Sequence, residues 1–104
     1  MTLTEAIAAF EAAGVPTRAV KFRTKTPPLP RCTYRLVRTY NAAADNRVSR
    51  VFATYEFELA TRDREIDLEH AIESRLATFW EKEGDDDPAE DLVLTTYTIS
   101  LTEE

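Results

Sequence analysis

The sequence predicts an α+β fold: a four-stranded antiparallel sheet with two helices packed on one face, in the order α-β-β-β-α-β. Two hydrophobic patterns support this prediction, because two segments repeat apolar residues at helical spacing and others alternate apolar with polar residues. Short runs rich in proline, glycine, asparagine and aspartate separate these segments. The chain has 104 residues and a mass of 11.8 kDa, so we expect residues 1–104 to form a single domain with one modest core.

The first helix is predicted over residues 3–13. Thr2 and Glu5 have the spacing of a capping box, in which each side chain accepts a hydrogen bond from the other residue's backbone amide. Gly14 supplies a residue that ends a helix easily, and Pro16 prevents its continuation. The apolar stripe of this helix consists of Leu3, Ile7 and Phe10, broadened by Ala6, Ala9 and Ala13.

Three strands are predicted next, over residues 18–23, 32–40 and 48–60. Three prolines between the first two strands favour a stiff extended loop at 24–31. The third strand has the clearest alternation, with one apolar and one largely polar face, which is typical of a half-buried antiparallel strand. Turn-forming residues at 41–46 predict that the second and third strands form a hairpin.

The second helix is predicted to begin at Thr61 or Asp63 and to run to Lys82. Gly84 is expected to end this helix, and the acidic run that follows it is expected to be a loop. A last strand is predicted over residues 91–101, where apolar and polar residues alternate again. The apolar seam of the helix, which would lie on the sheet, consists of Leu68, Ile72, Leu76 and Phe79, widened by Trp80.

Charge is distributed unevenly along the chain, whose formal net charge is −6. Residues 1–50 hold nine basic and three acidic side chains, a net of +6, whereas residues 51–104 hold four basic and sixteen acidic side chains, a net of −12. The overall sign argues against a protein that simply adheres to nucleic acid or to an acidic membrane. No apolar stretch is long enough to span a bilayer, and no basic region precedes an apolar run, so we expect neither a membrane span nor a signal peptide.

Cys32 and His70 are the only cysteine and the only histidine. A single cysteine cannot form an internal disulfide, which suits a reducing cytosol, and the strand pattern predicts a buried thiol. His70 shares a predicted helix face with Asp67 and Glu73, but metal sites need more ligands, so we expect an exposed histidine and no metal. No carboxylate pair or nucleophile stands out, and the sequence predicts no enzymatic activity and no cofactor.

Two other charged segments suggest binding functions that their details do not favour. The acidic run Asp85–Asp87 lacks the glycine and the distal glutamate of a calcium loop, so a solvated loop is expected. Arg31, Arg35 and Arg38 interleave with Tyr34 and Tyr40, as in surfaces that bind single strands. In an extended strand, however, Arg31 and Arg35 point away from Arg38 and both tyrosines, which divides that surface.

The charge polarity suggests contacts between identical subunits, in which unlike patches meet head to tail and close into a ring if the rotation allows. The alternative is that the two patches lie side by side and neutralise each other within one monomer, and the sequence allows both arrangements. Phe52 is expected on the uncovered face of the sheet, where it has no clear core role. The candidate interface residues are the basic Arg35, Arg38, Arg47 and Arg50 with Phe52, and the acidic Glu69, Glu73, Asp85, Asp86 and Asp87.

The chain as a whole resembles the small tail-terminator and head–tail joining proteins of siphovirus-type phages and prophages. The resemblance runs through Gly14-Val15-Pro16, the proline-rich approach to Tyr34, Ala44-Asp45-Asn46, and the run from Tyr55 to Thr61 that leads into an acidic helix. It covers most of the chain, although each piece is short. The acidic stretch from Asp85 to Asp91 is not part of the family pattern.

This resemblance implies a structural protein of the virion neck, assembled in the host cytoplasm, with no active site. Terminators of this type form a ring, commonly a hexamer, on the last layer of the tail tube, where they stop its polymerisation. The implied partners are other copies of the chain, the major tail protein and the head-closure or connector proteins, and DNA would pass through an acidic lumen. The alternatives are a connector or tail-completion adaptor of the same neck, and a small non-viral nucleic-acid-binding or interaction module.

Overall fold

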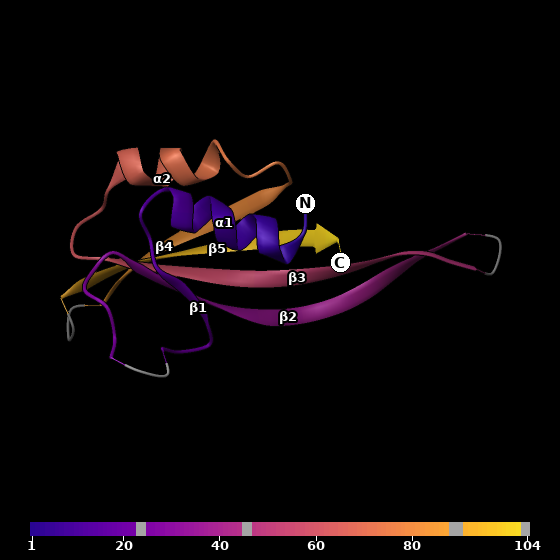
Figure 1. Cartoon of the computed structure of the whole chain (residues 1–104), viewed down its shortest axis with the longest axis horizontal. Coiled ribbons are helices and arrows are strands. Elements are labelled where there is room, and N and C mark those ends of the chain that lie inside the picture. Colours follow the sequence, from indigo (N-terminus) through magenta and orange to yellow (C-terminus); the bar gives the residue numbers. More distant parts are fainter. Residues whose placement is uncertain (23–24, 45–46, 88–90, 103–104) are drawn as a thin grey trace.

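The computed structural model describes residues 1–22, 25–44, 47–87 and 91–102, with the backbone alone at 42–44, 47–49 and 87. Two helices and five strands follow one another along the chain (Figure 1). The elements are α1 (Leu3–Ala12), β1 (Thr17–Ala19), β2 (Arg31–Ala44), β3 (Arg47–Thr61), α2 (Ile66–Glu73), β4 (Trp80–Asp87) and β5 (Leu92–Thr102). The predicted α+β class is confirmed.

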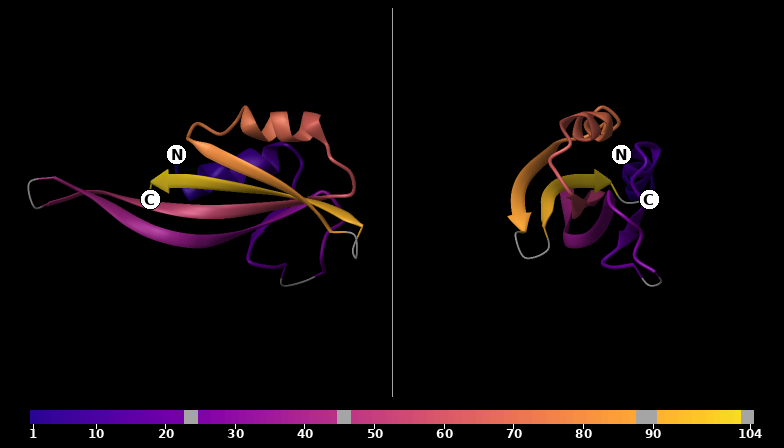
Figure 2. Two further views of the ribbon diagram at one scale, coloured as in Figure 1. Left: turned by 180° about the vertical axis from the view of Figure 1, so that it is seen from behind. Right: turned by 90° about the vertical axis from the view of Figure 1, so that its left-hand side faces the viewer.

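The strands form one mixed sheet rather than the predicted four-stranded antiparallel one. Its order is β1-β2-β3-β5-β4, with β1 parallel to β2 and every other neighbouring pair antiparallel. Both helices lie on the same face of this twisted sheet, as predicted (Figure 2). The opposite face carries no helix among the described elements.

Helix α1 begins and ends close to where the sequence predicts. The Thr2 hydroxyl accepts a hydrogen bond from the Glu5 amide, and the Glu5 carboxylate accepts one from the Thr2 amide, which confirms the capping box. After Ala13 the chain turns at Gly14, whose φ of +88° is accessible to glycine at little cost. The helix buries Ala6, Ala9 and Phe10 against the sheet.

Strands β2 and β3 form the predicted hairpin, and both are longer than predicted. Their pairing runs from Arg31 opposite Ala60 to Ala44 opposite Arg47. Strand β5 accompanies β3 only as far as Phe52, which pairs with Thr102. Residues 41–44 and 47–51 therefore form a two-stranded arm that projects beyond the other elements (Figure 1). Of the predicted turn at 41–46, residues 45 and 46 lie outside the described residues.

The prediction of a second helix that runs to Lys82 was wrong. Helix α2 starts at Ile66 and ends at Glu73, and the chain then turns and forms β4 from Trp80. Pairing with β5 along all of β4 satisfies backbone groups of both strands. Inward packing of Trp80, whose ring lies 5.8 Å from that of Tyr97, also favours the strand.

Gly84 and Asp85–Asp87, predicted as a helix end and a loop, belong to β4 instead. Phe79, predicted on the helix seam, is 70% exposed just before this strand.

The first predicted strand is also shorter than expected, since β1 ends at Ala19 rather than at residue 23. Val20 has a φ of +59°, which a β-branched residue adopts only under local strain. Its amide nevertheless donates to the Tyr34 carbonyl, and the Lys21 amide turns back to the carbonyl of Ala19. The strand therefore ends at Val20, and β1 covers only the beginning of β2.

The core lies between the helices and one face of the sheet. Phe10 of α1 stacks on Phe57 of β3, with ring centroids 4.8 Å apart, and meets Tyr97 of β5 edge-on at 5.8 Å. Helix α2 contributes Ile72, which is fully buried. Cys32 is buried in the same cluster, as predicted. The largest remaining core residues are Val15, Leu59, Leu76, Ile99 and Leu101.

Candidate functional site

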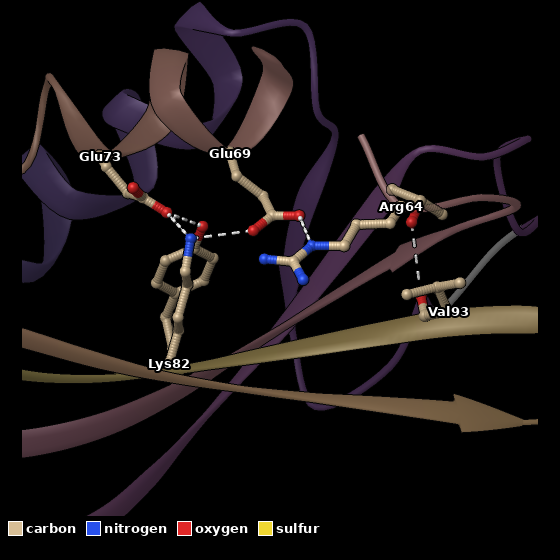
Figure 3. A network of polar contacts seen from close by, with 7 residues as sticks. Arg64, Glu69, Glu73, Lys82 and Val93 are labelled. Carbon is tan, nitrogen blue, oxygen red and sulfur yellow. Dashed lines mark hydrogen bonds and ion pairs between the residues drawn. The ribbon is translucent and has the colours of Figure 1, made fainter. Parts of the chain in front are cut away.

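A network of charged side chains lies between α2 and the sheet (Figure 3). The Lys82 ammonium of β4 lies 2.9 Å from Glu69 Oε1 and 2.6 Å from Glu73 Oε2. The Tyr97 hydroxyl of β5 donates to Glu73 Oε2 at 2.7 Å. Arg64, in the loop before α2, places its Nε 3.4 Å from Glu69 Oε2. Two carboxylates of the helix are thus balanced by one lysine and one arginine.

The network holds each of its shifted groups in its ordinary charge state near neutral pH. Burial alone would raise the pKa of Glu73, but hydrogen bonds from Lys82 and Tyr97 outweigh this and lower that pKa. Burial would lower the pKa of Lys82, yet its hydrogen bonds to Glu73 and Glu69 raise it. Burial and the neighbouring Glu73 raise the pKa of Tyr97, so the phenol stays protonated.

Such an arrangement is suited to holding α2 in place rather than to transferring protons. A general acid or base works best when its pKa lies near the working pH, and the shifts of Glu73, Lys82 and Tyr97 all lead away from neutrality. His70 is exposed on α2, as predicted. Within residues 1–22, 25–44, 47–87 and 91–102, no three His, Cys, Asp or Glu residues gather into a set that could hold a metal ion.

Glu69 and Glu73 do not lie on the exposed acidic surface that the sequence suggested. Glu69 is only 2% exposed, and both carboxylates are engaged by Lys82 of their own chain. Lys82 and Tyr97 were not predicted as their partners, because the sequence pattern placed Lys82 in the same helix as the two glutamates. The alternation of Trp80 and Lys82 with acidic residues was the signal that could have identified the strand.

The basic candidate residues lie along the hairpin, on the outer strand β2 and on β3. Arg35 forms an ion pair with Glu56 across the hairpin, and Arg38 and Arg50 are exposed. Phe52 is half-buried and stacks on Tyr40 at the base of the arm, with ring centroids 5.3 Å apart. The side chain of the remaining candidate, Arg47, lies outside the described residues.

Apolar side chains are exposed along the same part of β2. Leu36 is 51% exposed and Tyr40 is 43% exposed, and Val37 between them is also exposed. A register shift at Val37 places Tyr40 on the helix-free face, whereas Leu36 lies on the helix face, so this edge exposes apolar groups on both sides. Exposed apolar side chains gathered in this way are typical of surfaces that contact another molecule. Simple alternation along the strand would put Leu36 and Tyr40 on the same side as the buried Cys32, so the sequence pattern does not identify these exposed side chains.

The acidic candidate residues Asp85 and Asp86 are exposed on β4, at the opposite edge of the sheet. Glu81 and Glu83 are exposed on the same strand, whereas the side chain of Asp87 lies outside the described residues. Strands β3 and β5 separate β2 from β4, so the basic and acidic edges are roughly 14 Å apart at a spacing of about 4.8 Å per strand. Among the described residues, no ion pair joins the arginines of the hairpin to the acidic residues of β4.

A shallow cavity of about 250 Å³ lies mainly on the helix-free face of the sheet. Its walls include Thr33 and Arg35 of β2, Glu56 and Glu58 of β3, and Thr96 of β5. Hydroxyl and carboxylate groups predominate here, so this face is polar and partly acidic.

Neither described helix is long and apolar enough to cross a lipid bilayer.

The described structure offers two kinds of candidate feature: an internal polar network that fixes α2, and two sheet edges of opposite charge. No known protein-family model and no curated protein sequence matches the chain.

Proposed function

We propose that the protein is a phage virion morphogenesis protein, a tail terminator that caps the tail tube as a ring of subunits and joins it to the head-closure complex. The observation that carries the proposal is the position of the charges, since a basic edge and an acidic edge lie on opposite sides of one small sheet. Unlike patches on opposite sides of a subunit favour head-to-tail contacts, which close into a ring when the rotation fits.

Two further features support this role. The projecting hairpin arm gives the subunit a long axis of 51 Å against 28 and 23 Å, so that one copy can reach across another. The helix-free face of the sheet carries Glu58 beside threonines, while Glu56 on that face is paired with Arg35. The acidic part of this face includes Glu81 and Glu83 of β4, and turned toward a lumen it would repel DNA phosphates and let the DNA pass. The resemblance of the sequence to the terminator family is consistent with both features.

The proposal is tested first by the native mass of the purified chain. Light scattering is expected to give a multiple of 11.8 kDa that decreases at high salt, because charge contacts between exposed groups are screened. Electron micrographs are expected to show rings. A chain that stays monomeric at its highest soluble concentration and never caps tail tubes would contradict the proposed role.

The position within the neck is tested by deleting the gene from the phage or prophage that carries it. Loss of a terminator is expected to leave tail tubes of excessive and variable length. Loss of a connector or tail-completion adaptor would instead leave tails of normal length that lack heads. Virions of normal length with normal head attachment would contradict both roles.

A nucleic-acid-binding module is the second candidate, and the exposed Arg38 and Arg50 near the Tyr40–Phe52 stack favour it. Such a module would bind oligonucleotides as a monomer or dimer, with an affinity that falls steeply as salt is raised. A ring that does not bind oligonucleotides measurably would exclude this candidate.

A further inference from the structure

The sheet has two open edges in its described part. At one edge, β1 covers β2 only at Cys32–Tyr34, so residues 35–44 of β2 have no described strand on their outer side. At the other edge, β4 pairs with β5 and has no described strand on its outer side. Unpaired strand edges can accept a strand of another molecule, and proteins usually protect or use them.

The two open edges match each other in direction and in length. Strands β2 and β4 are related by three successive antiparallel pairings, so they run in opposite directions within the sheet. Two copies in the same orientation, side by side, would therefore bring β4 of one antiparallel to β2 of the next. The open part of β2 covers residues 35–44, and β4 has 8 residues, so one strand can accompany the other along its length.

Charge and apolar exposure also favour the unlike pair of edges. Arg38 is exposed on β2, beside Arg35 with its partner Glu56, while the exposed charged side chains of β4 are acidic, as in Glu81 and Glu83. Lys82, which is also on β4, is engaged by the glutamates of α2. Two β4 edges would repel each other, whereas β4 beside β2 brings opposite charges together. Both edges also expose large apolar side chains, Leu36, Val37 and Tyr40 at one and Phe79 immediately before the other.

We propose that β4 of one copy pairs antiparallel with the open part of β2 of the next copy, so that the sheets of successive subunits become continuous. This inference rests on the ring of the proposed function and names the strands that would build it. Within one copy, Trp80 pairs with Ile99, Ile99 with Tyr55 and Tyr55 with Leu36, so the rest of β4 lies level with the part of β2 that precedes Leu36. To bring β4 beside residues 35–44 of the next copy, successive subunits would be displaced along the strand direction, as the staggered strands of a closed barrel are.

Cysteine cross-linking tests the pairing directly. Tyr40→Cys is combined in one chain with Glu81→Cys, Glu83→Cys or Asp85→Cys, and each double variant is oxidised under mild conditions. The strand pairings place all four of these positions on the helix-free face, so that their side chains can meet across the new pair of strands. We expect at least one combination to give a ladder of covalent multimers, because cross-strand disulfides form only when Cα atoms lie about 4.4–6.8 Å apart. The native Cys32 is fully buried, and burial raises the pKa of its thiol, so it should not compete.

The single-cysteine variants are the controls for this experiment. A mixture of Tyr40→Cys with the best β4 variant is expected to give heterodimers and nothing larger. A ladder in none of the combinations would overturn the proposal, and so would a Tyr40→Cys variant that dimerises with itself as fast as the mixture reacts.

A charge swap provides a second test that does not depend on disulfide geometry. Arg38→Glu and Glu83→Arg are each expected to weaken self-association about tenfold or more, and the double variant is expected to regain most of it. Arg62→Glu makes the same charge change at an exposed position in the loop after β3, where Arg62 lies 3.9 Å from the exposed Asp91, and serves as the matched control. Equal losses in all three single variants, or no recovery in the double variant, would contradict the pairing.

The outcomes separate this inference from the proposed function. Cross-links together with normal tail length after gene deletion would support the edge pairing and remove the terminator role. Overlong tails together with absent cross-links would support the terminator role and remove the edge pairing. A chain that is monomeric at its highest soluble concentration and forms no ladder would overturn the pairing of edges.

Discussion

Replacing Lys82 by methionine is expected to destabilise the fold strongly, because it removes the cation that joins α2 to β4. The lysine ammonium lies within 2.9 Å of Glu69 and 2.6 Å of Glu73, and Glu69 is only 2% exposed. Removing one partner of a fully buried ion pair costs about 3–5 kcal/mol. The Lys82 side chain is 26% exposed, and Arg64 and Tyr97 keep contacts with the two carboxylates, which reduces the cost.

We therefore expect Lys82→Met to lower the free energy of unfolding by about 2–3 kcal/mol. For a domain of this size, that loss corresponds to a decrease of Tm of roughly 10–20 °C. Urea titration followed by circular dichroism measures the free energy, and a thermal melt measures Tm. Lys21→Met removes the same charge from an exposed position and is the matched control, with an expected change within about 0.5 kcal/mol.

A second variant tests the physical reason for the loss. When Glu69→Gln and Glu73→Gln accompany Lys82→Met, no charge of the lysine–carboxylate cluster is left unpaired, and most of the stability should return. The stability difference between Lys82→Met and wild type should also shrink in acid, where the carboxylates become protonated. If Lys82→Met costs no more than Lys21→Met, or if the triple variant is no more stable than Lys82→Met, the network does not hold the helix as argued.

Three further predictions concern the core, the polar network and the buried thiol. Phe10→Ala removes a ring packed against two other aromatic rings and should cost about 3–5 kcal/mol in urea unfolding, whereas a loss below that of an ordinary surface substitution would contradict its central position. The lowered pKa of Glu73 contributes stability that is fully present above its usual value of 4.5 and is lost as the pH falls through the folded value. The raised pKa of Lys82 contributes stability that is fully present below 10.5 and is lost as the pH rises through the folded value. Urea titrations at a series of pH values should show that the free energy of unfolding of the wild type falls at both the acidic and the basic end. The same dependence on pH in Lys82→Met would contradict this prediction. Cys32 should react with a thiol reagent only as fast as the chain opens, since its thiol is fully buried and burial raises its pKa. If the folded chain reacts nearly as fast as the urea-unfolded chain, the thiol is accessible and this prediction is wrong.

The hairpin and the first helix could be predicted because their signals are local. The capping box of Thr2 and Glu5 specifies where α1 begins, and Gly14 specifies where it can end. In β3, alternation of apolar and polar residues allows only one side of the strand to face the core. Burial of Cys32 followed from the same kind of alternation in β2.

The polar network could not be predicted, because its members come from separate elements whose relation depends on packing. Glu69 and Glu73 have the spacing of one helix face, but nothing local shows that this face turns inward. Lys82 and Tyr97 meet Glu73 only because β4 pairs with β5 beneath the helix. The sequence therefore indicated acidic residues on α2 without indicating their partners.

By itself, the sequence determined the α+β class, the capped first helix, the central hairpin and the polarity of charge along the chain. Only the tertiary contacts show that Trp80–Asp87 is a strand and not the end of a helix. The cause is non-local, because backbone hydrogen bonds to β5 and the contact of Trp80 with Tyr97 outweigh the helical spacing of Leu76 and Phe79. The same pairing placed the acidic strand at the edge opposite the basic one, so that a charge difference along the sequence became two separate edges of one sheet.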